Sequence, residues 1–399
     1  MDSNPTNKPS PAFISPDSSA HQLMVDLLET ADIEIGGARP WDMHLNAPHV
    51  PERIFADGSL GLGEAYMDGA WHSPQLDEFI FRILRARLDQ HVQPLKLVFH
   101  SMKARLFNLQ NSKRAWKVGE AHYDLGNDFY TAMLDPRMTY TCGYWKNAHN
   151  LADAQEAKLD LICRKLELKP GMRVLDIGCG WGSFMGYAAQ HYGVECVGVT
   201  ISKEQAEWAR QRYSGLPLEF RLQDYRDIDE RFDRIASVGM FEHVGRKNHR
   251  VFMEVAAQCL ADDGLFLLHT IGKNERNTVP DPWIDRYIFP NGDLPSISQI
   301  GDAAGGLFVT EDLHNFGSDY DKTLMAWHAN FEAAWPRFEA KLGERFYRMW
   351  RYYLLSCAGA FRSREIQLWQ WVFSKQGVIG GYNRPEYVSE AGRSNGAIS

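Results

Sequence analysis

The chain between residues 173 and 269 alternates between short apolar runs and longer amphipathic segments. The apolar runs predict β-strands at residues 173–177, 195–200, 218–222, 232–238 and 264–269. The segments between them predict helices at residues 184–191, 203–214 and 247–260. Ser202 and Gln205 have the spacing of a capping box, which places a helix start directly after Thr200. This alternation predicts an α/β fold, with helices on both faces of a parallel sheet.

The segments on either side have a different character. Residues 1–20 are rich in Ser, Pro and Asn and predict a disordered tail. A first domain is expected at 21–105, with a helix at 21–31, a glycine-rich middle at 58–63 and a helical run from Leu76. A linker at 106–120 leads to a second domain at 121–399. Near its end we expect a long helical stretch from Tyr320 to about Arg362 and a last strand at 366–373.

Composition narrows the classes of protein that fit. The 399 residues are 44% hydrophobic and 24% charged, with a net charge of −8, which argues against a general nucleic-acid binder. No apolar run approaches the ~20 residues that span a bilayer, and no signal peptide is recognisable. The six cysteines are scattered without a zinc-binding pattern, as expected in a reducing cytosol, so we expect no metal. The sequence therefore predicts a soluble, cytoplasmic protein.

A basic amphipathic stretch begins near Phe81 in this otherwise acidic chain. Its apolar positions include Ile80, Leu84 and the segment 95–99, and the only acid among its cations is Asp89. Such a stretch suits anionic lipid headgroups at a bilayer surface. A solvated helix face that packs on its own domain is the equally weighted alternative. The cations are Arg82, Arg85, Arg87, Lys96, Lys103, Arg105, Lys113, Arg114 and Lys117.

The most informative motif is the glycine-rich turn after the first predicted strand of the second domain. Gly178, Gly180 and Gly182 alternate in a strand-turn-helix context, and Asp176 stands at the end of the strand. Glycine lets backbone approach a ligand closely because no Cβ intervenes. The spacing is Gly-x-Gly-x-Gly, which differs from the dinucleotide-binding pattern. It resembles the S-adenosylmethionine (SAM) turn of class I methyltransferases.

The ends of the next two strands carry polar groups suited to the rest of such a ligand. The second strand ends at Thr200 without the acid that holds a ribose in many NAD-binding folds, so NAD loses support. Thr200 and Gln205 offer hydrogen bonds to a ribose. Gln223, Asp224 and Tyr225 suit an adenine edge and face. Ordinary loop chemistry is the alternative for both sets.

Several blocks together resemble the cyclopropane fatty acid synthase family. They are LGLGEAYMD at 60–68, HYDLGN at 122–127, YTCGYW at 140–145, the glycine turn, GMFEHV at 239–244, LHTIG at 268–272, YDKTLMAW at 320–327 and CAGAF at 357–361. The resemblance implies a seven-stranded, mostly parallel class I methyltransferase sheet, preceded by a smaller, mainly helical lipid-binding domain. It also implies that Tyr140, Thr141 and Ile201 contact SAM. Thr141 departs from the serine that is usual in the family but keeps the hydroxyl.

The resemblance implies methylene transfer from SAM to the double bond of an acyl chain in a membrane phospholipid. Attack on the sulfonium methyl leaves a carbocation, so the site must exclude water and offer aromatic faces. A proton must then leave the delivered methyl group. Residues proposed for an aromatic box are Tyr140, Tyr144, Trp145, Phe241, Tyr320 and Trp327.

The proton acceptor implied by the resemblance is a bound bicarbonate ion. Cys142 and Ile271 would hold it through their backbones, and Glu242, His269 and Tyr320 through their side chains. Direct proton removal by Glu242 is the variant mechanism. Cys357 is retained as a candidate site residue, although burial would disfavour its thiolate and the chemistry needs no covalent intermediate.

The resemblance further implies a homodimer at the inner face of the membrane, where the first domain holds the bilayer and the second accepts one acyl chain. Three alternatives stay open. The product could instead carry a methyl or methylene branch, the chain could be a non-catalytic lipid-binding protein on this fold, or it could methylate a small molecule.

Overall fold

A seven-stranded sheet forms the centre of the larger part of the molecule. The computed structural model describes residues 19–91, 125–276 and 279–385, so almost all of the predicted tail and all of the predicted linker lie outside the described residues. The strand order is β5-β4-β3-β6-β7-β9-β8. Strands β3 to β7 run parallel, whereas β9 pairs antiparallel with both β7 and β8. The bounds are β3 Arg173–Ile177, β4 Glu195–Thr200, β5 Leu218–Leu222, β6 Phe232–Val238, β7 Leu260–Lys273, β8 Val309–Asn315 and β9 Ile366–Ser374.

The expected α/β fold is confirmed, and one strand was missed. Strands β3 to β6 have the predicted bounds, and β7 extends the predicted 264–269 at both ends. Strand β8 was not predicted because its sequence, VTEDLHN, is largely polar and mostly outside the core. It lies at the edge of the sheet, where pairing with β9 stabilises it without a continuous apolar run.

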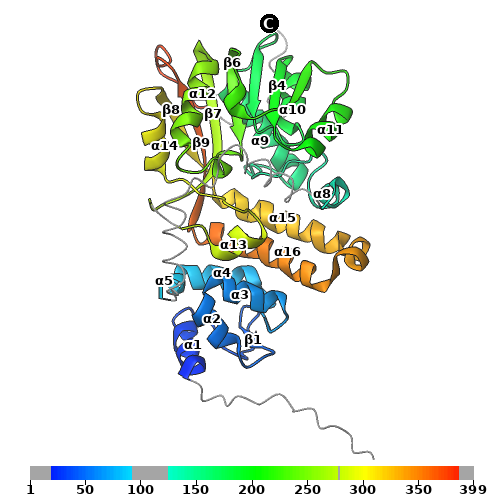
Figure 1. Cartoon of the computed structure of the whole chain (residues 1–399), viewed down its shortest axis with the longest axis vertical. Helices are drawn as coiled ribbons and strands as arrows, with labels where there is room; N and C mark the ends of the chain where they lie inside the picture. Colours follow the sequence, from blue (N-terminus) through cyan, green and yellow to red (C-terminus); the bar gives the residue numbers. More distant parts are fainter. Residues whose placement is uncertain (1–18, 92–124, 277–278, 386–399) are drawn as a thin grey trace, which may run out of the picture.

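Helices cover both faces of the sheet (Figure 1). On one face, helices α9, α10 and α11 share an apolar core with β3 and β4, and on the other, α12 and α14 share a core with β6 and β7. Asn150 caps α9 by accepting a hydrogen bond from the backbone of Asp153. The bounds are α8 Asn127–Met133, α9 Leu151–Lys165, α10 Ser183–Tyr192, α11 Lys203–Arg212, α12 His249–Cys259, α13 Pro282–Tyr287 and α14 Ile297–Ala304.

The long helical stretch expected from 320 to 362 is two helices that lie side by side (Figure 1). Helix α15 spans Ser318–Ala334, a 3₁₀ turn spans Trp335–Arg337, and α16 spans Glu339–Arg362. Pro336, which lacks a backbone N–H, stands in the turn, and Gly343 adopts φ 74° inside α16. These residues end one helix and bend the next, within the helical stretch that the sequence predicted.

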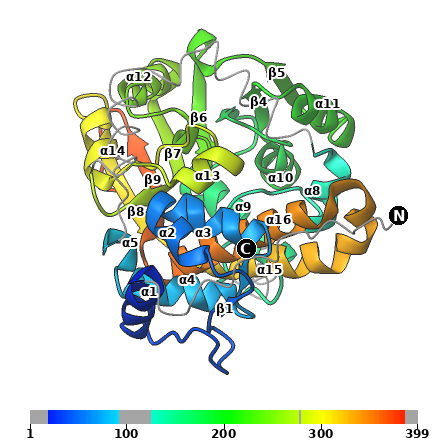
Figure 2. The same ribbon diagram turned by 60° about the horizontal axis from the view of Figure 1, so that its bottom comes forward.

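The N-terminal helices pack onto α16 and α13. Helices α3 and α4 contact α16, and α2 packs against α3 (Figure 1 and Figure 2). The expected glycine-rich middle forms helix α3. Glycine is needed there for close packing, because a Cβ on Gly61 would lie 2.3 Å from the Arg53 carbonyl oxygen and one on Gly63 would lie 2.4 Å from the Trp283 ring. The bounds are α1 Ser19–Glu29, β1 His44–Leu45, α2 Val50–Asp57, α3 Ser59–Met67, β2 Trp71–His72, α4 Leu76–Arg85 and α5 Leu88–His91.

Only the first part of the basic amphipathic stretch falls on described residues, since Lys96 and the later cations do not. Arg82 pairs with Asp32 and Glu78 and lies 4.1 Å from the centre of the Trp41 ring. Ile80 is buried on the inner face of α4. Arg82 and Ile80 therefore pack on their own domain, whereas Arg85 and Arg87 are exposed. Within the ranges described, no helix is long and apolar enough to cross a membrane.

Candidate active site

The glycine turn has the conformation that its sequence predicts. Gly178, Gly180 and Gly182 have φ values of 86°, 52° and 79°, in the left-handed region that glycine favours. A Cβ on Gly178 would lie 2.6 Å from the Met240 side chain, and one on Gly182 would lie 2.6 Å from the Phe220 ring. The turn therefore combines unusual backbone angles with close packing, and helix α10 begins immediately after it.

The residues predicted to hold SAM surround one cavity of about 960 Å³. Gly182 is the one predicted SAM-binding residue that does not line this cavity. Ser202 accepts a hydrogen bond from the Gln205 backbone, but the Gln205 side chain turns to the Thr200 hydroxyl at 3.2 Å. The predicted capping box is therefore only half formed, and Gln205 presents its amide at the end of β4. The lining residues are Tyr140, Thr141, Asp176, Gly178, Gly180, Thr200, Ile201, Gln205, Gln223, Asp224 and Tyr225.

Lys158 is a lining residue that sequence reasoning missed. Its Nζ donates a hydrogen bond to Thr141 Oγ1 at 2.8 Å, and the side chain is fully buried. Burial lowers the pKa of Lys158 to about 8 and raises the pKa of Asp176 to about 7, while the lysine charge opposes the rise at Asp176. Asp176 Oδ1 is buried with no hydrogen-bond partner among the described residues. The only sequence signal was a lysine in the apolar stripe of α9.

We expect Lys158→Met to weaken binding of S-adenosylhomocysteine (SAH) about tenfold at pH 7, because one pKa unit at Asp176 corresponds to a factor of ten. Without the ammonium group the Asp176 pKa rises further and the carboxyl is neutral at pH 7. The affinity of the variant for SAH should recover as pH rises, because the Asp176 carboxyl then ionises. Isothermal titration at several pH values measures this.

Lys165→Met is the matched control for this prediction. Lys165 is a buried lysine on the same helix that lies 3.3 Å from Asp312, and the cavity wall does not include it. Its replacement should lower stability and leave SAH affinity unchanged. Wild-type affinity of Lys158→Met at every pH would exclude a role for the lysine in cofactor binding.

Glu242 lies after β6, in the 3₁₀ turn Phe241–His243. Its Oε1 accepts a hydrogen bond from the Ile271 backbone at 2.6 Å, whereas Oε2 is buried without a partner in the described part of the chain. Burial raises the pKa of Glu242 to about 7. A carboxyl that faces the cavity and changes protonation near neutral pH is suited to proton transfer or to holding an anion.

His269 is fully buried, and burial lowers its pKa well below the usual value, so the ring is neutral. Gln370 Nε2 lies 3.2 Å from His269 Nδ1. An amide nitrogen can only donate, so Nδ1 accepts and the ring proton sits on Nε2. That nitrogen has no partner among the described residues. His269 therefore holds an unused donor.

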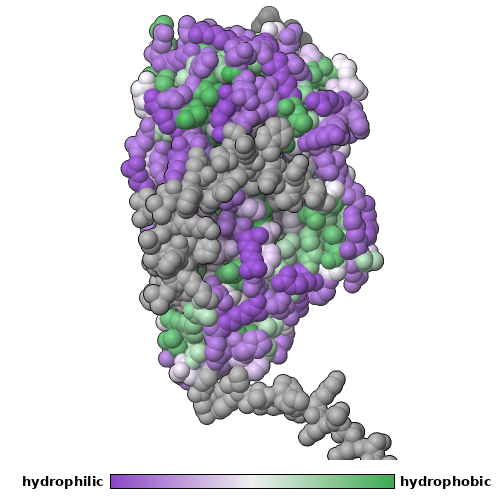
Figure 3. Space-filling model, viewed as in Figure 1, coloured by the Kyte–Doolittle hydropathy of each residue, from purple (hydrophilic) through white to green (hydrophobic). Residues whose placement is uncertain are grey.

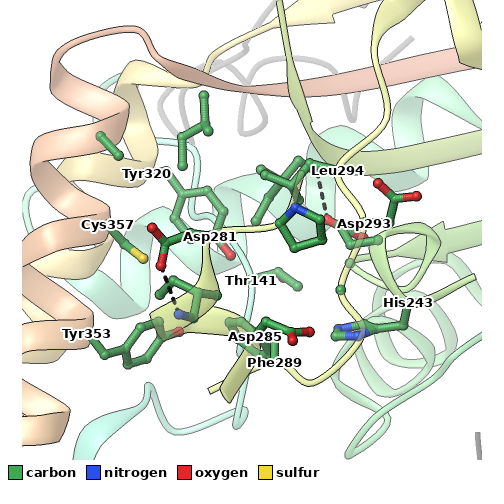
Figure 4. A pocket seen from close by; sticks show the side chains of 18 of the residues that line it. Thr141, His243, Asp281, Asp285, Phe289, Asp293, Leu294, Tyr320, Tyr353 and Cys357 are labelled. Atoms are coloured by element: carbon green, nitrogen blue, oxygen red, sulfur yellow. Dashed lines mark hydrogen bonds between the residues drawn. The ribbon is translucent and has the colours of Figure 1, made fainter. Parts of the chain in front are cut away.

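The structure brings Glu242, Ile271 and Tyr320 to the cavity wall, while Cys142 and His269 are buried outside it. The Cys142 thiol donates a hydrogen bond to the Gly143 carbonyl oxygen at 3.1 Å. Figure 4 shows Tyr320 and Cys357 facing His243 and other residues across the cavity.

Part of the predicted aromatic box lines the cavity. Tyr140 and Tyr320 do so, and Trp327 packs behind them with ring centres 5.1 and 6.0 Å away. The other three predicted members pack elsewhere: Phe241 stacks on His249, Tyr144 packs against Phe316, and Trp145 donates a hydrogen bond to Thr323. Further aromatic residues that line the cavity include Phe289, Tyr352, Tyr353 and Phe361, none of which was predicted for the box.

Cys357 lines the cavity, and burial raises the pKa of its thiol to about 12. The thiol is therefore protonated at neutral pH and is a poor nucleophile. We expect Cys357→Ser to keep activity within about threefold of wild type, with unchanged SAH affinity, in a steady-state assay. A loss of about a hundredfold or more would show that the thiol acts in the chemistry.

The strand order, the glycine turn and the cavity at the carboxyl ends of the strands define a class I SAM-dependent methyltransferase. The same fold is seen in coclaurine N-methyltransferase bound to N-methylheliamine and SAH, at 22% identity over 79% of this chain and 99% of that one, with a TM-score of 0.65. The family model for mycolic acid cyclopropane synthetase matches residues 110–371. The chain belongs to this family, as its motifs predicted.

Individual relatives agree with this assignment. The chain is 54% identical to a cyclopropane-fatty-acyl-phospholipid synthase of Escherichia coli, over 92% of this chain and 96% of the relative. It is also similar to the cyclopropane synthase MmaA2 from Mycobacterium tuberculosis, at 33% identity over 67% of this chain and 100% of that one, with a TM-score of 0.62. The mycolic acid cyclopropane synthase CmaA1 complexed with SAH and CTAB is 36% identical to this chain. The match covers 65% of this chain and 98% of that one, with a TM-score of 0.61.

Proposed function

We propose that this enzyme transfers a methylene group from SAM to the cis double bond of an unsaturated acyl chain in a membrane phospholipid, forming a cyclopropane ring. One observation carries the proposal: the glycine turn, the buried Glu242 carboxyl and the Tyr320 ring line a single cavity. The name of the E. coli relative supports the phospholipid substrate class.

The chemistry balances in two steps. The π electrons of the alkene attack the sulfonium methyl carbon, a carbon–carbon bond forms, and the carbon–sulfur bond breaks to release SAH. A proton then leaves the delivered methyl group, and the electrons of that carbon–hydrogen bond close the ring. Tyr140 and Tyr320 line the cavity, and their rings would stabilise positive charge there; the Tyr140 hydroxyl is hydrogen-bonded to the Tyr353 hydroxyl at 2.9 Å.

We propose that a bicarbonate ion at this end of the cavity accepts the proton, held by Glu242 and Tyr320 of the cavity wall and by His269, which is buried behind that wall. Three features support it: Glu242 Oε2 and His269 Nε2 have no partners among the described residues, and the Tyr320 phenol is kept neutral because burial raises its pKa well above the usual value. Neutral His269 and Tyr320 are donors, and Glu242 joins them when it is protonated. These residues would hold and orient the anion.

Incubation with SAM and vesicles of an unsaturated phospholipid tests the proposed function. We expect a mass gain of one CH2, loss of the double bond, and high-field cyclopropane signals in the proton NMR spectrum. A methyl- or methylene-branched chain, or no lipid product at all, would contradict the proposal. Absence of SAH binding would instead favour a non-catalytic lipid-binding protein.

We further propose peripheral binding to anionic membranes at the inner face and a homodimeric state. The exposed Leu23 of α1 and the green side chains at the lower end of the molecule in Figure 3 support membrane contact there. The dimer is supported by the family resemblance alone. Absence of co-sedimentation with anionic vesicles would exclude the membrane proposal. A monomer in sedimentation equilibrium would exclude the dimer.

A further inference from the structure

The cavity that contains the proposed reaction site extends into the N-terminal helices. One end is lined by the glycine turn and Glu242, and the other by side chains of α1, α2 and α4, among them Leu27, Phe55 and Ile83. The first domain was expected to hold the bilayer while the second accepted the acyl chain. The N-terminal helices also supply part of the wall of the cavity.

The part of the wall that the N-terminal helices supply is almost entirely apolar. Apart from Gly58, Ser59 and Asp89, every described lining residue before position 92 is a hydrocarbon, thioether or phenyl side chain. Such a wall offers almost no partners for hydrogen bonds, so a polar ligand would lose its hydration without compensation. A hydrocarbon chain binds favourably to such a wall, and each buried methylene raises its affinity roughly fourfold. SAM does not need this end, because its predicted contacts lie at the strand ends.

Helices α13 and α16 join the two ends of the cavity. Cys357 and Ala360 of α16 and Trp283 of α13 line it between them. Helix α4 lies close to α16 at Gly359, where a Cβ would meet the Asp77 carbonyl oxygen at 2.6 Å and the Phe81 nitrogen at 2.9 Å. This close crossing brings the apolar face of α4 next to the reaction site.

The apolar extension is built by a part of the chain that the family model does not cover. That model begins at residue 110, whereas the E. coli relative aligns with 92% of this chain. The extension is therefore an addition to the shared methyltransferase core.

We propose that the N-terminal end of the cavity binds the methyl-terminal segment of the reacting acyl chain, the carbons beyond the double bond. The proposal rests on the proposed function. The ester end of the chain is tied to a polar headgroup that stays in water, so the free hydrocarbon end is the part that enters an apolar pocket. Leu27, Phe55 and Ile83 then set how long that segment can be.

Competition between phospholipids tests the proposal. The lipids carry the double bond at one fixed distance from the ester and differ only in the number of carbons beyond it; conversion is followed by mass spectrometry. For Leu27→Trp and Ile83→Trp we expect conversion of the longest chains, relative to the shortest, to fall about tenfold. Phe55→Ala should shift the preference toward longer chains.

Glu29→Trp is the matched control, because Glu29 lies on the same helix as Leu27, is exposed and is outside the cavity wall. It should keep the wild-type length profile, and all variants should keep wild-type SAH affinity, which shows that they fold. An unchanged profile in Leu27→Trp, Ile83→Trp and Phe55→Ala, with product still formed, would overturn the subsite alone. Absence of product from the wild-type enzyme with every lipid would overturn the proposed function itself.

Discussion

Replacement of Glu242 by alanine should lower the rate of product formation by about 10²–10³, the range typical for loss of a group that positions a proton acceptor. The variant leaves the Ile271 N–H without its acceptor and removes the carboxyl whose second oxygen faces the proposed anion. SAH affinity should stay within about threefold of wild type. Glu275→Gln is the control, because Glu275 is an exposed carboxylate that lines the same cavity, and it should keep full activity.

Glu242→Gln separates the two mechanisms that the residues allow. With a pKa raised to about 7, Glu242 is neutral below pH 7 and donates from Oε2, whereas above pH 7 it is ionised and repels an anion. If bicarbonate accepts the proton, the wild-type enzyme needs more bicarbonate as pH rises through 7. The glutamine variant then stays within about tenfold of wild-type activity without that pH dependence, since an amide donates at any pH. If Glu242 is the base, glutamine is as damaging as alanine and bicarbonate depletion has no effect.

Gly178→Ala should weaken SAH binding by about tenfold to a hundredfold. The new Cβ would lie 2.6 Å from Met240 Cγ and 2.7 Å from Met240 Cβ, and Met240 directly precedes the turn that carries Glu242. The backbone there has φ 86°, and such strain in a non-glycine residue costs about 1–3 kcal/mol. The turn should therefore relax away from the shape that meets the ligand, as isothermal titration would show.

Gly171→Ala controls for the backbone strain in this prediction. Gly171 has φ 83° and precedes the opposite end of β3, and a Cβ there meets nothing within 4 Å. This variant should lower the melting temperature and leave SAH affinity unchanged. Equal losses of affinity in the two variants would show that the effect is general destabilisation and not the shape of the glycine turn.

The parts of the fold that the sequence predicted are those whose signal is local. Strands β3 to β6 are apolar runs between helices with clear ends, and the glycine turn follows β3 directly. Strand β8 escaped prediction because its stability comes from a partner about sixty residues later in the chain. The break between α15 and α16 was also missed. Pro336 and Gly343 interrupt a pattern that is otherwise helical over residues 320–362.

Some residues of the candidate site could be predicted from the sequence, and others could not. The residues at the strand ends could be found because parallel strands bring their carboxyl ends to one edge of the sheet. The contact between Glu242 and Ile271 joins the turn after β6 to strand β7, and only the family resemblance pointed to it. Lys158 and the apolar lining from α1 and α4 were missed, because a periodic pattern shows which face of a helix is buried but not whether that face meets core or cavity.

The central claim is that the delivered methyl group loses a proton and closes a ring. SAM with a fully deuterated methyl group tests it most directly, by mass spectrometry of the lipid after incubation with unsaturated phospholipid vesicles. The account predicts that the product has lost its double bond and gained one carbon bearing two deuterium atoms. Retention of all three deuterium atoms would show that the methyl group is not deprotonated, and would contradict ring closure.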